Sequence, residues 1–392
     1  EGRMLTMEEA VMGIGTRPQA VAAMWVDANS YACINGREMK AYDAITGKEV
    51  EYKAEGRGAQ GPMRGGMRGA IPNKNGITAF TKGQSLYIND KGTETCVAQN
   101  ESDQITYGQS VSRNEFGING GIFWSPCGGK LAFYRKDESR VTDFPLLDIS
   151  TRTGTLKSIK YPMNGMESEE IKLGIYDLDS KQTVWCDVTD FGYDRYLCNI
   201  SWSPDDRYVF IQVLDRTQKH MKFNMYRASD GAFVRTLFTE DDDRYVEPSD
   251  PVRFLKDSYS FIYTSNVRDG YRNLYLCDTL GTIRRLTSVD ADVAYVTNDG
   301  TNVFYTSAEV SPVENHLFKI SVTGLKGRRG AENLAKAKFG KPMRLTSEEG
   351  WHSVTLSEDC KKFIDRYSSF NVPSVTQVKT TDGKLLREIG RA

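Results

Sequence analysis

The carboxylate of Glu115 has the clearest potential for chemistry in this chain of 392 residues. It follows Arg113 and Asn114 and precedes Phe116, within a segment, Val111–Phe123, that is too long for an ordinary turn between strands. An ionised carboxylate in a projecting segment could receive an ammonium group through charge-assisted hydrogen bonds. From the residues alone, the simpler interpretation is an arginine–glutamate surface pair, which contributes little.

Residues for nucleophilic catalysis do not accompany this carboxylate. A serine hydrolase usually carries its nucleophile in a G-x-S-x-G pentapeptide, with a histidine and an acid elsewhere in the chain. No such pentapeptide occurs, and the three histidines, His220, His316 and His352, lie in expected strands or beside the start of one. We therefore expect the histidines to be structural, and we expect no catalytic triad in this chain.

The seven cysteines do not form a metal-binding pattern. They are widely spaced, with no C-x-x-C pair and no neighbouring histidine, which disfavours a zinc site. We expect no metal and no cofactor. Most thiols are expected to be small buried groups on strands, although Cys186 and Cys198 could bridge neighbouring strands in an oxidising compartment. The cysteines are Cys33, Cys96, Cys127, Cys186, Cys198, Cys277 and Cys360.

Charge and hydrophobicity limit the classes of partner. The chain has 51 Lys and Arg against 52 Asp and Glu, for a net charge of −1. Because the basic residues are scattered, nucleic acid is not an expected partner. No run of about 18 apolar residues occurs, so no membrane span is expected. The sequence begins at Glu1 without an initiator methionine, which suggests a mature, periplasmic or secreted chain after signal-peptide removal.

The elements that must position Glu115 belong to a repeat of short strands. Phe123–Tyr134 and Ser201–Ile211 both contain a strand, a Ser-Pro turn that ends in glycine or aspartate, and a second strand. Proline presets φ at the first turn position, and glycine or aspartate tolerates the positive φ that closes the turn. Each segment is therefore predicted to be a hairpin.

Weaker copies of this hairpin recur about every 40 to 50 residues, and each is followed by a second hairpin. Four strands per repeat is typical of a β-propeller, whereas helical repeats would need apolar residues at i, i+3 and i+4. We predict an all-β fold: a β-propeller of about seven to eight four-stranded blades over residues 20–392, after an N-terminal segment of residues 1–19. The expected blades lie near residues 20–54, 70–100, 118–190, 198–238, 250–288, 294–347 and 352–389.

Two segments interrupt the repeat. Glu55–Ala70 is rich in glycine, arginine and methionine and is expected to be an irregular loop between blades. An arginine–glycine segment could also indicate RNA binding, but the neutral net charge disfavours that function. Lys326–Pro342 is a basic insertion, which we expect to be a solvated surface loop.

Several motifs occur in order along most of the chain. The most distinctive is Asn114–Gly117 followed by Phe123–Arg135. The others are Lys160–Gly165, Tyr245–Pro248, Arg268–Tyr271, Glu349–Ser353 and Phe363–Ser369. Together they resemble the N-terminal propeller of the dipeptidyl peptidase IV family of prolyl-oligopeptidase-like serine exopeptidases, especially its bacterial members. Because the motifs are spread over the chain, the match is more specific than a single motif.

The resemblance implies a role in substrate binding. In that family the propeller packs on an α/β-hydrolase domain, and acidic residues on a short insertion bind the free N-terminus of the peptide. Carried over, that role falls to Glu115, with Asn114 beside it and Arg113 and Phe116 in support. Anchoring the ammonium determines which peptide bond reaches the nucleophile, so the whole enzyme would remove N-terminal dipeptides. A homodimer is a further possibility.

Three features depart from the family pattern. Family members commonly have paired glutamates, whereas Asn114 precedes Glu115 here. Glu55–Ala70 stands where the family has its second blade, which also provides an arginine for a substrate carbonyl, and no counterpart of that arginine is evident. The chain ends near Asp382–Ile389, where family members continue into the hydrolase, so we expect the hydrolase domain to be absent from this chain.

Two hypotheses about function follow. The first is a non-catalytic, substrate-gating propeller of a dipeptidyl-peptidase-IV-like serine exopeptidase. The alternative is a stand-alone propeller that binds peptides or proteins without enzymatic activity. A propeller enzyme with its own site in the central channel is a third possibility, but the sequence offers no metal or acid cluster to support it.

Overall fold

The computed structural model describes residues 4–12, 21–35, 38–52, 69–256, 258–325 and 334–392. These residues are mostly in antiparallel sheets, together with one short helix, α1 (Met7–Met12), and two 3₁₀ turns, η1 (Ser112–Asn114) and η2 (Leu334–Lys336). Most of the Gly/Arg-rich segment Glu55–Ala70 and part of the basic segment Lys326–Pro342 lie outside the described residues.

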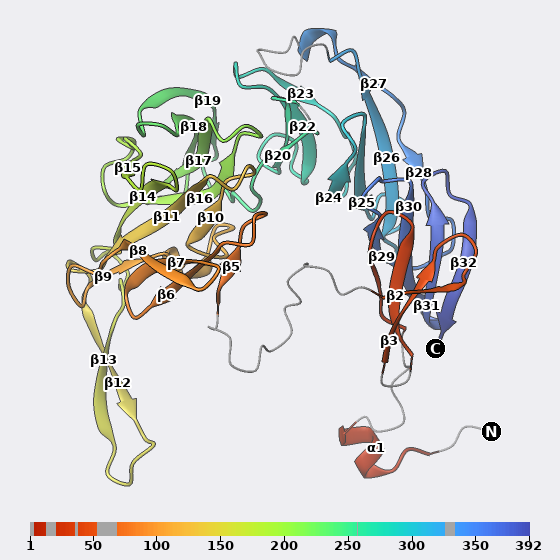
Figure 1. Cartoon of the computed structure of the whole chain (residues 1–392), viewed down its shortest axis with the longest axis horizontal. Coiled ribbons are helices and arrows are strands. Elements are labelled where there is room, and N and C mark those ends of the chain that lie inside the picture. Colours follow the sequence, from red (N-terminus) through yellow and green to blue (C-terminus); the bar gives the residue numbers. More distant parts are fainter. Residues whose placement is uncertain (1–3, 13–20, 36–37, 53–68, 257, 326–333) are drawn as a thin grey trace.

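Each sheet is built mainly from strands that follow one another in sequence and pair antiparallel. Among the described residues, five sheets have four strands, two have five and one has two. The seven larger sheets stand side by side around a central space (Figure 1). They are the blades of a β-propeller, so the predicted fold class is confirmed.

The strands of these blades have the following bounds in chain order. They are β1 (Ala23–Trp25), β2 (Ser30–Asn35), β3 (Glu38–Asp43) and β4 (Glu49–Val50); β5 (Ile71–Pro72), β6 (Thr78–Lys82), β7 (Ser85–Asp90) and β8 (Thr93–Ala98); β9 (Ile105–Tyr107), β10 (Ile122–Trp124), β11 (Lys130–Asp137), β14 (Glu170–Asp177) and β15 (Thr183–Trp185); β16 (Arg195–Trp202), β17 (Tyr208–Asp215), β18 (His220–Arg227) and β19 (Phe233–Asp241); β20 (Arg253–Phe254), β21 (Phe261–Ser265), β22 (Asn273–Cys277) and β23 (Ile283–Arg285); β24 (Val293–Asn298), β25 (Asn302–Ser307), β26 (His316–Thr323), β27 (Lys338–Phe339) and β28 (Met343–Arg344); and β29 (Trp351–Leu356), β30 (Lys362–Ser369), β31 (Val372–Thr380) and β32 (Leu385–Arg391).

The third blade differs from the simple four-strand repeat in two ways. It begins earlier than predicted, because β9 also pairs with β11. In addition, β12 (Asp143–Asp148) and β13 (Thr155–Lys160) form a separate two-stranded sheet. This hairpin, here called the arm, projects far from the propeller (Figure 1). The predicted blade at residues 118–190 therefore contains a projection that the repeat pattern did not indicate.

The two Ser-Pro turns have the predicted hairpin form. The hydroxyl of Ser125 accepts a hydrogen bond from the backbone N–H of Lys130 at 3.0 Å, and that of Ser203 accepts one from Tyr208 at 2.9 Å. Gly128 and Asp206 close the turns at φ of 75° and 60°. Each turn thus begins with a side-chain hydrogen bond and ends with a residue type that tolerates positive φ.

Three tryptophans on the first strands of their blades connect adjacent blades in the same manner. The indole N–H of Trp124 donates to Ile71 O at 2.8 Å, and that of Trp202 donates to Phe123 O at 3.1 Å. Likewise Trp25 donates to Thr355 O at 2.8 Å. The N-terminal blade β1–β4 therefore follows the C-terminal blade β29–β32 as β10–β15 follows β5–β8.

Apolar clusters join most neighbouring blades. Buried side chains connect β5–β8 with the third blade, the third, fourth and fifth blades with one another, the fifth with the sixth, the sixth with the seventh, and the seventh with β1–β4. None of these clusters of described residues joins β1–β4 to β5–β8, and the two blades stand apart in Figure 1. Among the described residues, apolar packing thus connects each pair of neighbouring blades except the first and the second.

Two further sequence expectations can be compared with the structure. All seven cysteines are free thiols, so Cys186 and Cys198 do not form the disulfide that their spacing left open. Among the described residues, no helix is both long and apolar enough to span a bilayer.

Candidate functional site

Glu115 follows a left-handed turn at the entrance to the third blade. The turn is η1, whose residues Ser112, Arg113 and Asn114 have φ of 50°, 56° and 62°. Phe116, at 55°, also lies in this region, whereas Glu115 itself is extended at φ −85° and ψ 172°. Non-glycine residues in the left-handed region cost about 1–3 kcal/mol each and persist only where the surroundings enforce them.

Contacts on both sides of Glu115 enforce this conformation. The backbone N–H of Ser112 donates to the carboxylate of Glu169 at 2.7 Å, and this carboxylate side chain is buried. Phe116 packs on Tyr196, with ring centroids 4.5 Å apart. Burial, together with the nearby charge of Glu115, raises the pKa of Tyr196, although Arg216 opposes this effect. Tyr196 therefore stays a neutral, largely apolar support for Phe116.

Gly117 completes the turn because no larger residue fits there. Its φ is +72°, and a Cβ added to it would lie 2.3 Å from Asn199 Oδ1 and 2.7 Å from Ser249 O. The backbone of the Glu115 segment therefore lies directly against the fourth blade and the segment before the fifth. This close approach fixes Glu115 at the boundary between blades.

The carboxylate of Glu115 lines a cavity of about 410 Å³. Among the described residues it makes no side-chain hydrogen bond or ion pair, so its charge remains available. The cavity is bounded by Glu115, Phe116, Gly117, Gln218, Tyr245, Val246, Glu247, Pro248 and Ser249. Its walls thus combine a free carboxylate with apolar and aromatic groups, a composition that could receive a cation next to an apolar group.

The other predicted site residues lie close by but do not line this cavity. Arg113 makes no ion pair with Glu115 among the described residues, and its guanidinium instead lies over the ring of Tyr161, 4.2 Å from the centroid. The side chain of Asn114 is hydrogen-bonded to the hydroxyl of Ser110. The structure therefore groups Glu115 with Phe116 in the cavity wall and directs Arg113 away from it.

Glu247 is a second carboxylate in the same cavity, which the sequence analysis did not single out. Its only described ion pair is a long one, 3.8 Å to Arg272, and about half of its side chain is exposed. The Tyr245–Pro248 motif contains Glu247, but in the sequence this motif indicates only the family resemblance and not a position in the cavity. Two acids, from the segments that precede the third and the fifth blades, thus lie around one cavity.

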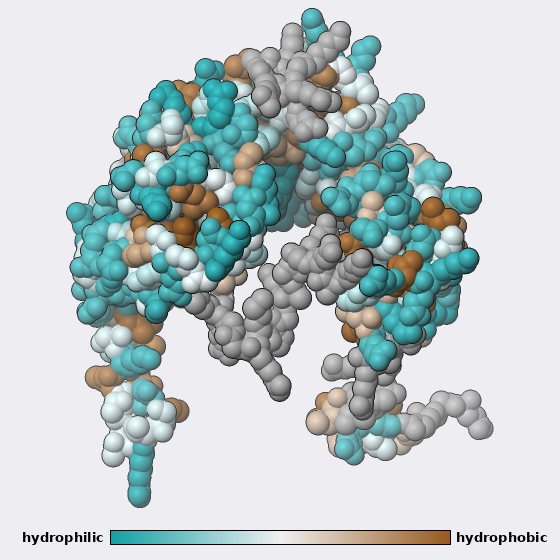
Figure 2. Space-filling model, in the orientation of Figure 1, coloured by the Kyte–Doolittle hydropathy of each residue, from teal (hydrophilic) through white to brown (hydrophobic). Residues whose placement is uncertain are grey.

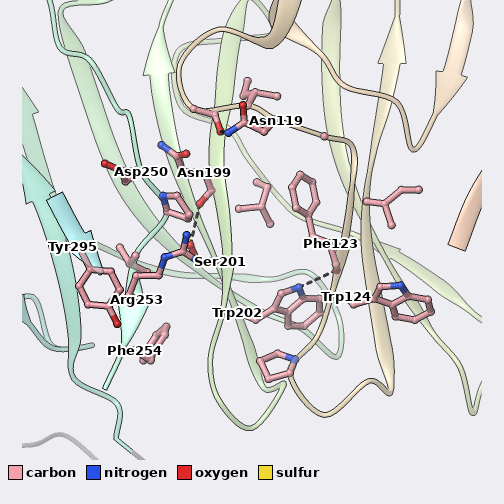
Figure 3. Close-up of a pocket in the computed structure, with 18 of the residues that line it drawn as sticks. Asn119, Phe123, Trp124, Asn199, Ser201, Trp202, Asp250, Arg253, Phe254 and Tyr295 are labelled. Atoms are coloured by element: carbon pink, nitrogen blue, oxygen red, sulfur yellow. Dashed lines mark hydrogen bonds between the residues drawn. The ribbon is translucent and has the colours of Figure 1, made fainter. Parts of the chain in front are cut away.

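A larger cavity of about 820 Å³ adjoins the first, since Gly117 and Ser249 line both. Figure 3 shows Phe123, Trp202 and Phe254 around it, with Arg253 extending from beside Tyr295 toward Ser201. Asp250 is the single acidic residue among the described residues that line it. The described residues that line this cavity therefore include no cluster of acidic side chains.

Among the described residues, one cluster could hold a metal ion. It consists of Glu348, His352 and Asp365, whose potential ligand atoms lie within 4.8 Å of one another. However, the ammonium of Lys379 lies 2.5 Å from Glu348 Oε2 and 3.1 Å from Asp365 Oδ2. A metal ion would have to displace this buried lysine. The cluster is therefore an internal charge network between strands of the last blade.

Comparison with known proteins gives a consistent result. Residues 71–374 match the model of the dipeptidyl peptidase IV (DPP IV) N-terminal region. Dipeptidyl-aminopeptidase B of Aspergillus niger is 23% identical over 435 residues, covering 99% of this chain and 46% of that protein. The chain spans between about a third and a half of the length of the first curated relatives that it matches.

Two solved structures extend the comparison. A Bacteroides ovatus protein assigned as a dipeptidyl aminopeptidase IV superposes with a TM-score of 0.71 and 30% identity, over 94% of this chain and 52% of that one. Dipeptidyl peptidase 4 of Porphyromonas gingivalis gives a TM-score of 0.78 at 21% identity, over all of this chain and 62% of that one. The likeness therefore extends over nearly the whole propeller.

Proposed function

Because the chain belongs to the dipeptidyl peptidase IV family, as its N-terminal region, we propose that it is the non-catalytic, substrate-gating propeller of a serine exopeptidase that removes N-terminal dipeptides. The hydrolytic step belongs to an α/β-hydrolase domain of the intact protein. This chain contributes the recognition of the peptide's free N-terminus, and Glu115 is the residue that binds it.

The observation that carries the proposal is the state of Glu115. Its carboxylate has no partner among the described residues, yet the backbone on both sides of it is held in a strained turn. A charged group that is preorganised and left unpaired can bind a cation without first breaking an internal contact. The α-ammonium of a peptide is a cation of the right size, and it donates charge-assisted hydrogen bonds to carboxylates.

Glu247 supplies the second carboxylate in this proposal. Family members commonly use two adjacent glutamates, and the position next to Glu115 is occupied here by Asn114. Glu247 reaches the same cavity from the segment before the fifth blade. Its long contact with Arg272 at 3.8 Å can be exchanged for an ammonium at little cost, since exposed ion pairs are weak.

Binding the ammonium also sets the length of the product. Once the N-terminus is fixed at Glu115, the distance from it to the nucleophile determines which peptide bond is attacked. A peptide whose amine is blocked loses the charge that Glu115 recognises. The intact enzyme should therefore release dipeptides from free N-termini and should not act on N-acetylated peptides.

The proposal includes a periplasmic or secreted location and a homodimer. Exposed apolar side chains along the arm, among them Leu147, Ile149 and Leu156, mark the contact surface proposed for a second copy (Figure 2). An isolated two-stranded hairpin is only marginally stable in water, so covering it would stabilise it. Cell fractionation tests the location, and sedimentation of Leu147→Lys beside the wild type tests the dimer.

Hydrolysis of Ala-Pro-p-nitroanilide by the intact protein tests the main proposal. Glu115→Gln keeps the shape of the side chain but removes its charge, so kcat/KM should fall about ten- to hundredfold, as expected for loss of a hydrogen bond to a charged group. Glu358→Gln, an exposed glutamate on the β29–β30 turn, is the matched control and should behave as the wild type. Equal kcat/KM for Glu115→Gln and the wild type would disprove the role of Glu115.

A further inference from the structure

Two contacts of η1 come from one short stretch, residues 161–169, between the arm and β14. We propose that Glu169 and Tyr161 are positioning residues for Glu115. Glu169 holds the left-handed turn in place, and Tyr161 keeps Arg113 away from the Glu115 carboxylate. This inference rests on the proposed function, because it concerns how the same carboxylate is kept ready for an ammonium.

Glu169 acts on the first residue of the turn. Its carboxylate accepts the N–H of Ser112 at 2.7 Å, and only 7% of each of these two residues is exposed. Among the described residues, the Glu169 side chain forms one hydrogen bond, and its donor is the N–H of Ser112. Without this carboxylate, the N–H of Ser112 would be buried without an acceptor, which disfavours the left-handed turn relative to conformations that expose it. Glu169 therefore determines where Glu115 leaves the propeller surface.

Tyr161 acts on the charge next to Glu115. The guanidinium of Arg113 lies 4.2 Å from the centre of its ring. The ring is itself held at the base of the arm, since Tyr161 N–H donates to Thr142 O at 3.0 Å and Phe144 lies 5.7 Å from it. A cation on an aromatic face is attracted by the ring quadrupole, so Arg113 remains there.

Releasing Arg113 would create a competitor for the ammonium. Arg113 is two residues before Glu115, and its long side chain could then pair with the Glu115 carboxylate, as the sequence alone suggested. Such a pair occupies the group that must bind the substrate. The stacking on Tyr161 thus keeps Glu115 free, and deletion of Arg113 should compensate for loss of Tyr161.

The intact protein and Ala-Pro-p-nitroanilide provide the test for Glu169. Glu169→Ala should raise KM about tenfold or more while kcat changes little, because misplacement of a binding group weakens substrate positioning. Glu169→Gln retains an oxygen that can accept the Ser112 N–H and should recover most of the loss. If Glu169→Ala has the KM of the wild type, or if Glu169→Gln is no better than Glu169→Ala, the role of Glu169 is overturned.

Tyr161 is tested by a double-mutant cycle. Tyr161→Ala should raise KM severalfold, Tyr161→Phe should not, and Tyr161→Ala combined with Arg113→Ala should return KM toward the value of Arg113→Ala alone. A purely structural role of Tyr161 would leave the double variant as impaired as Tyr161→Ala, and that result would overturn the inference. This cycle tests the role of Tyr161 independently of the Glu169 variants.

Glu115→Gln, measured in the same assay, separates this inference from the proposed function. If Glu115→Gln is unimpaired, the proposed function fails. If Glu115→Gln is impaired while Glu169→Ala and Tyr161→Ala have the kinetics of the wild type, only the positioning inference fails. Thermal unfolding of each variant confirms that KM is compared between folded proteins.

Discussion

Replacing Lys379 with methionine tests the charge network of the last blade. Lys379 lies in β31 with 2% of its side chain exposed, and its ammonium contacts Glu348 at 2.5 Å and Asp365 at 3.1 Å. Asp365 is fully buried and also lies 2.8 Å from Nδ1 of His352. Methionine fills a similar volume without the charge, so the substitution removes the ion pairs while leaving the packing largely intact.

The expected loss follows from the burial of Asp365. Removing one partner of a buried ion pair leaves an uncompensated charge and costs about 3–5 kcal/mol. For a chain of 392 residues, an unfolding entropy of about 2.1 cal/mol/K per residue converts this cost into a midpoint lower by about 4–6 °C. A shift of this size is measurable by thermal unfolding.

Glu348 adds a dependence on pH. Burial alone would raise its pKa, but the hydrogen bond and charge of Lys379 lower it from 4.5 to about 2. A carboxylate with a depressed pKa in the folded state stabilises the fold above about pH 4.5 and loses this contribution as the pH falls toward 2. The unfolding temperature of Lys379→Met should be lower than that of the wild type at pH 7. Between pH 5 and pH 3 it should therefore fall less than that of the wild type.

Thermal unfolding followed by circular dichroism at pH 7, 5, 4 and 3 measures both effects. Lys40→Met is the matched control, because Lys40 forms a surface pair with Glu49 at 3.1 Å and such pairs contribute little. If Lys379→Met and Lys40→Met unfold at the same temperature at pH 7, the reasoning about the buried network is refuted. A difference that does not shrink as the pH falls would refute the assignment to Glu348.

Two further substitutions test how the blades are held together. Trp25→Phe keeps an aromatic ring but removes the donor to Thr355 O. It should lower the free energy of unfolding by about 1 kcal/mol and speed amide hydrogen exchange in β1–β4. Unchanged exchange in β1–β4 would contradict the proposed connection between the first and last blades. Gly117→Ala introduces a Cβ 2.3 Å from Asn199 Oδ1 at φ +72°, so it should lower the free energy of unfolding by about 1–3 kcal/mol. Gly120→Ala, where a Cβ meets no atom within 4 Å, serves as its control, and equal urea midpoints for the two variants would show that Gly117 is not required.

Local features of the fold were predictable from the sequence because their causes are local. In the Ser-Pro turns, the residues that set φ and accept the closing hydrogen bond are neighbours in the chain. Ser125 and Gly128 are three positions apart, and both act as their types suggest. The strand repeat could be predicted for the same reason, since each hairpin carries its own turn signal.

Features that depend on distant contacts could not be predicted in this way. The alternation of strands and turns does not distinguish the arm from a hairpin inside a blade, because the difference lies in what its faces contact. Glu247 joins Glu115 only through the placement of two blades, and these residues are 132 positions apart in the sequence. The left-handed turn of Ser112, Arg113 and Asn114 contains no glycine, and its first residue is bonded to Glu169, 57 positions away in the sequence.

The packing of the first blade against the last has a consequence for synthesis on the ribosome. Strands β1–β4 are translated before the other described blades, but their described apolar cluster is shared with the last blade, which includes Ile364 and Val378. Domains usually begin to fold from the N-terminus as the chain is made. Here the apolar side chains of β1–β4, among them Trp25 and Tyr31, cannot pack against the last blade until about 300 more residues have been translated. A chaperone that shields this nascent segment would be most needed over that interval.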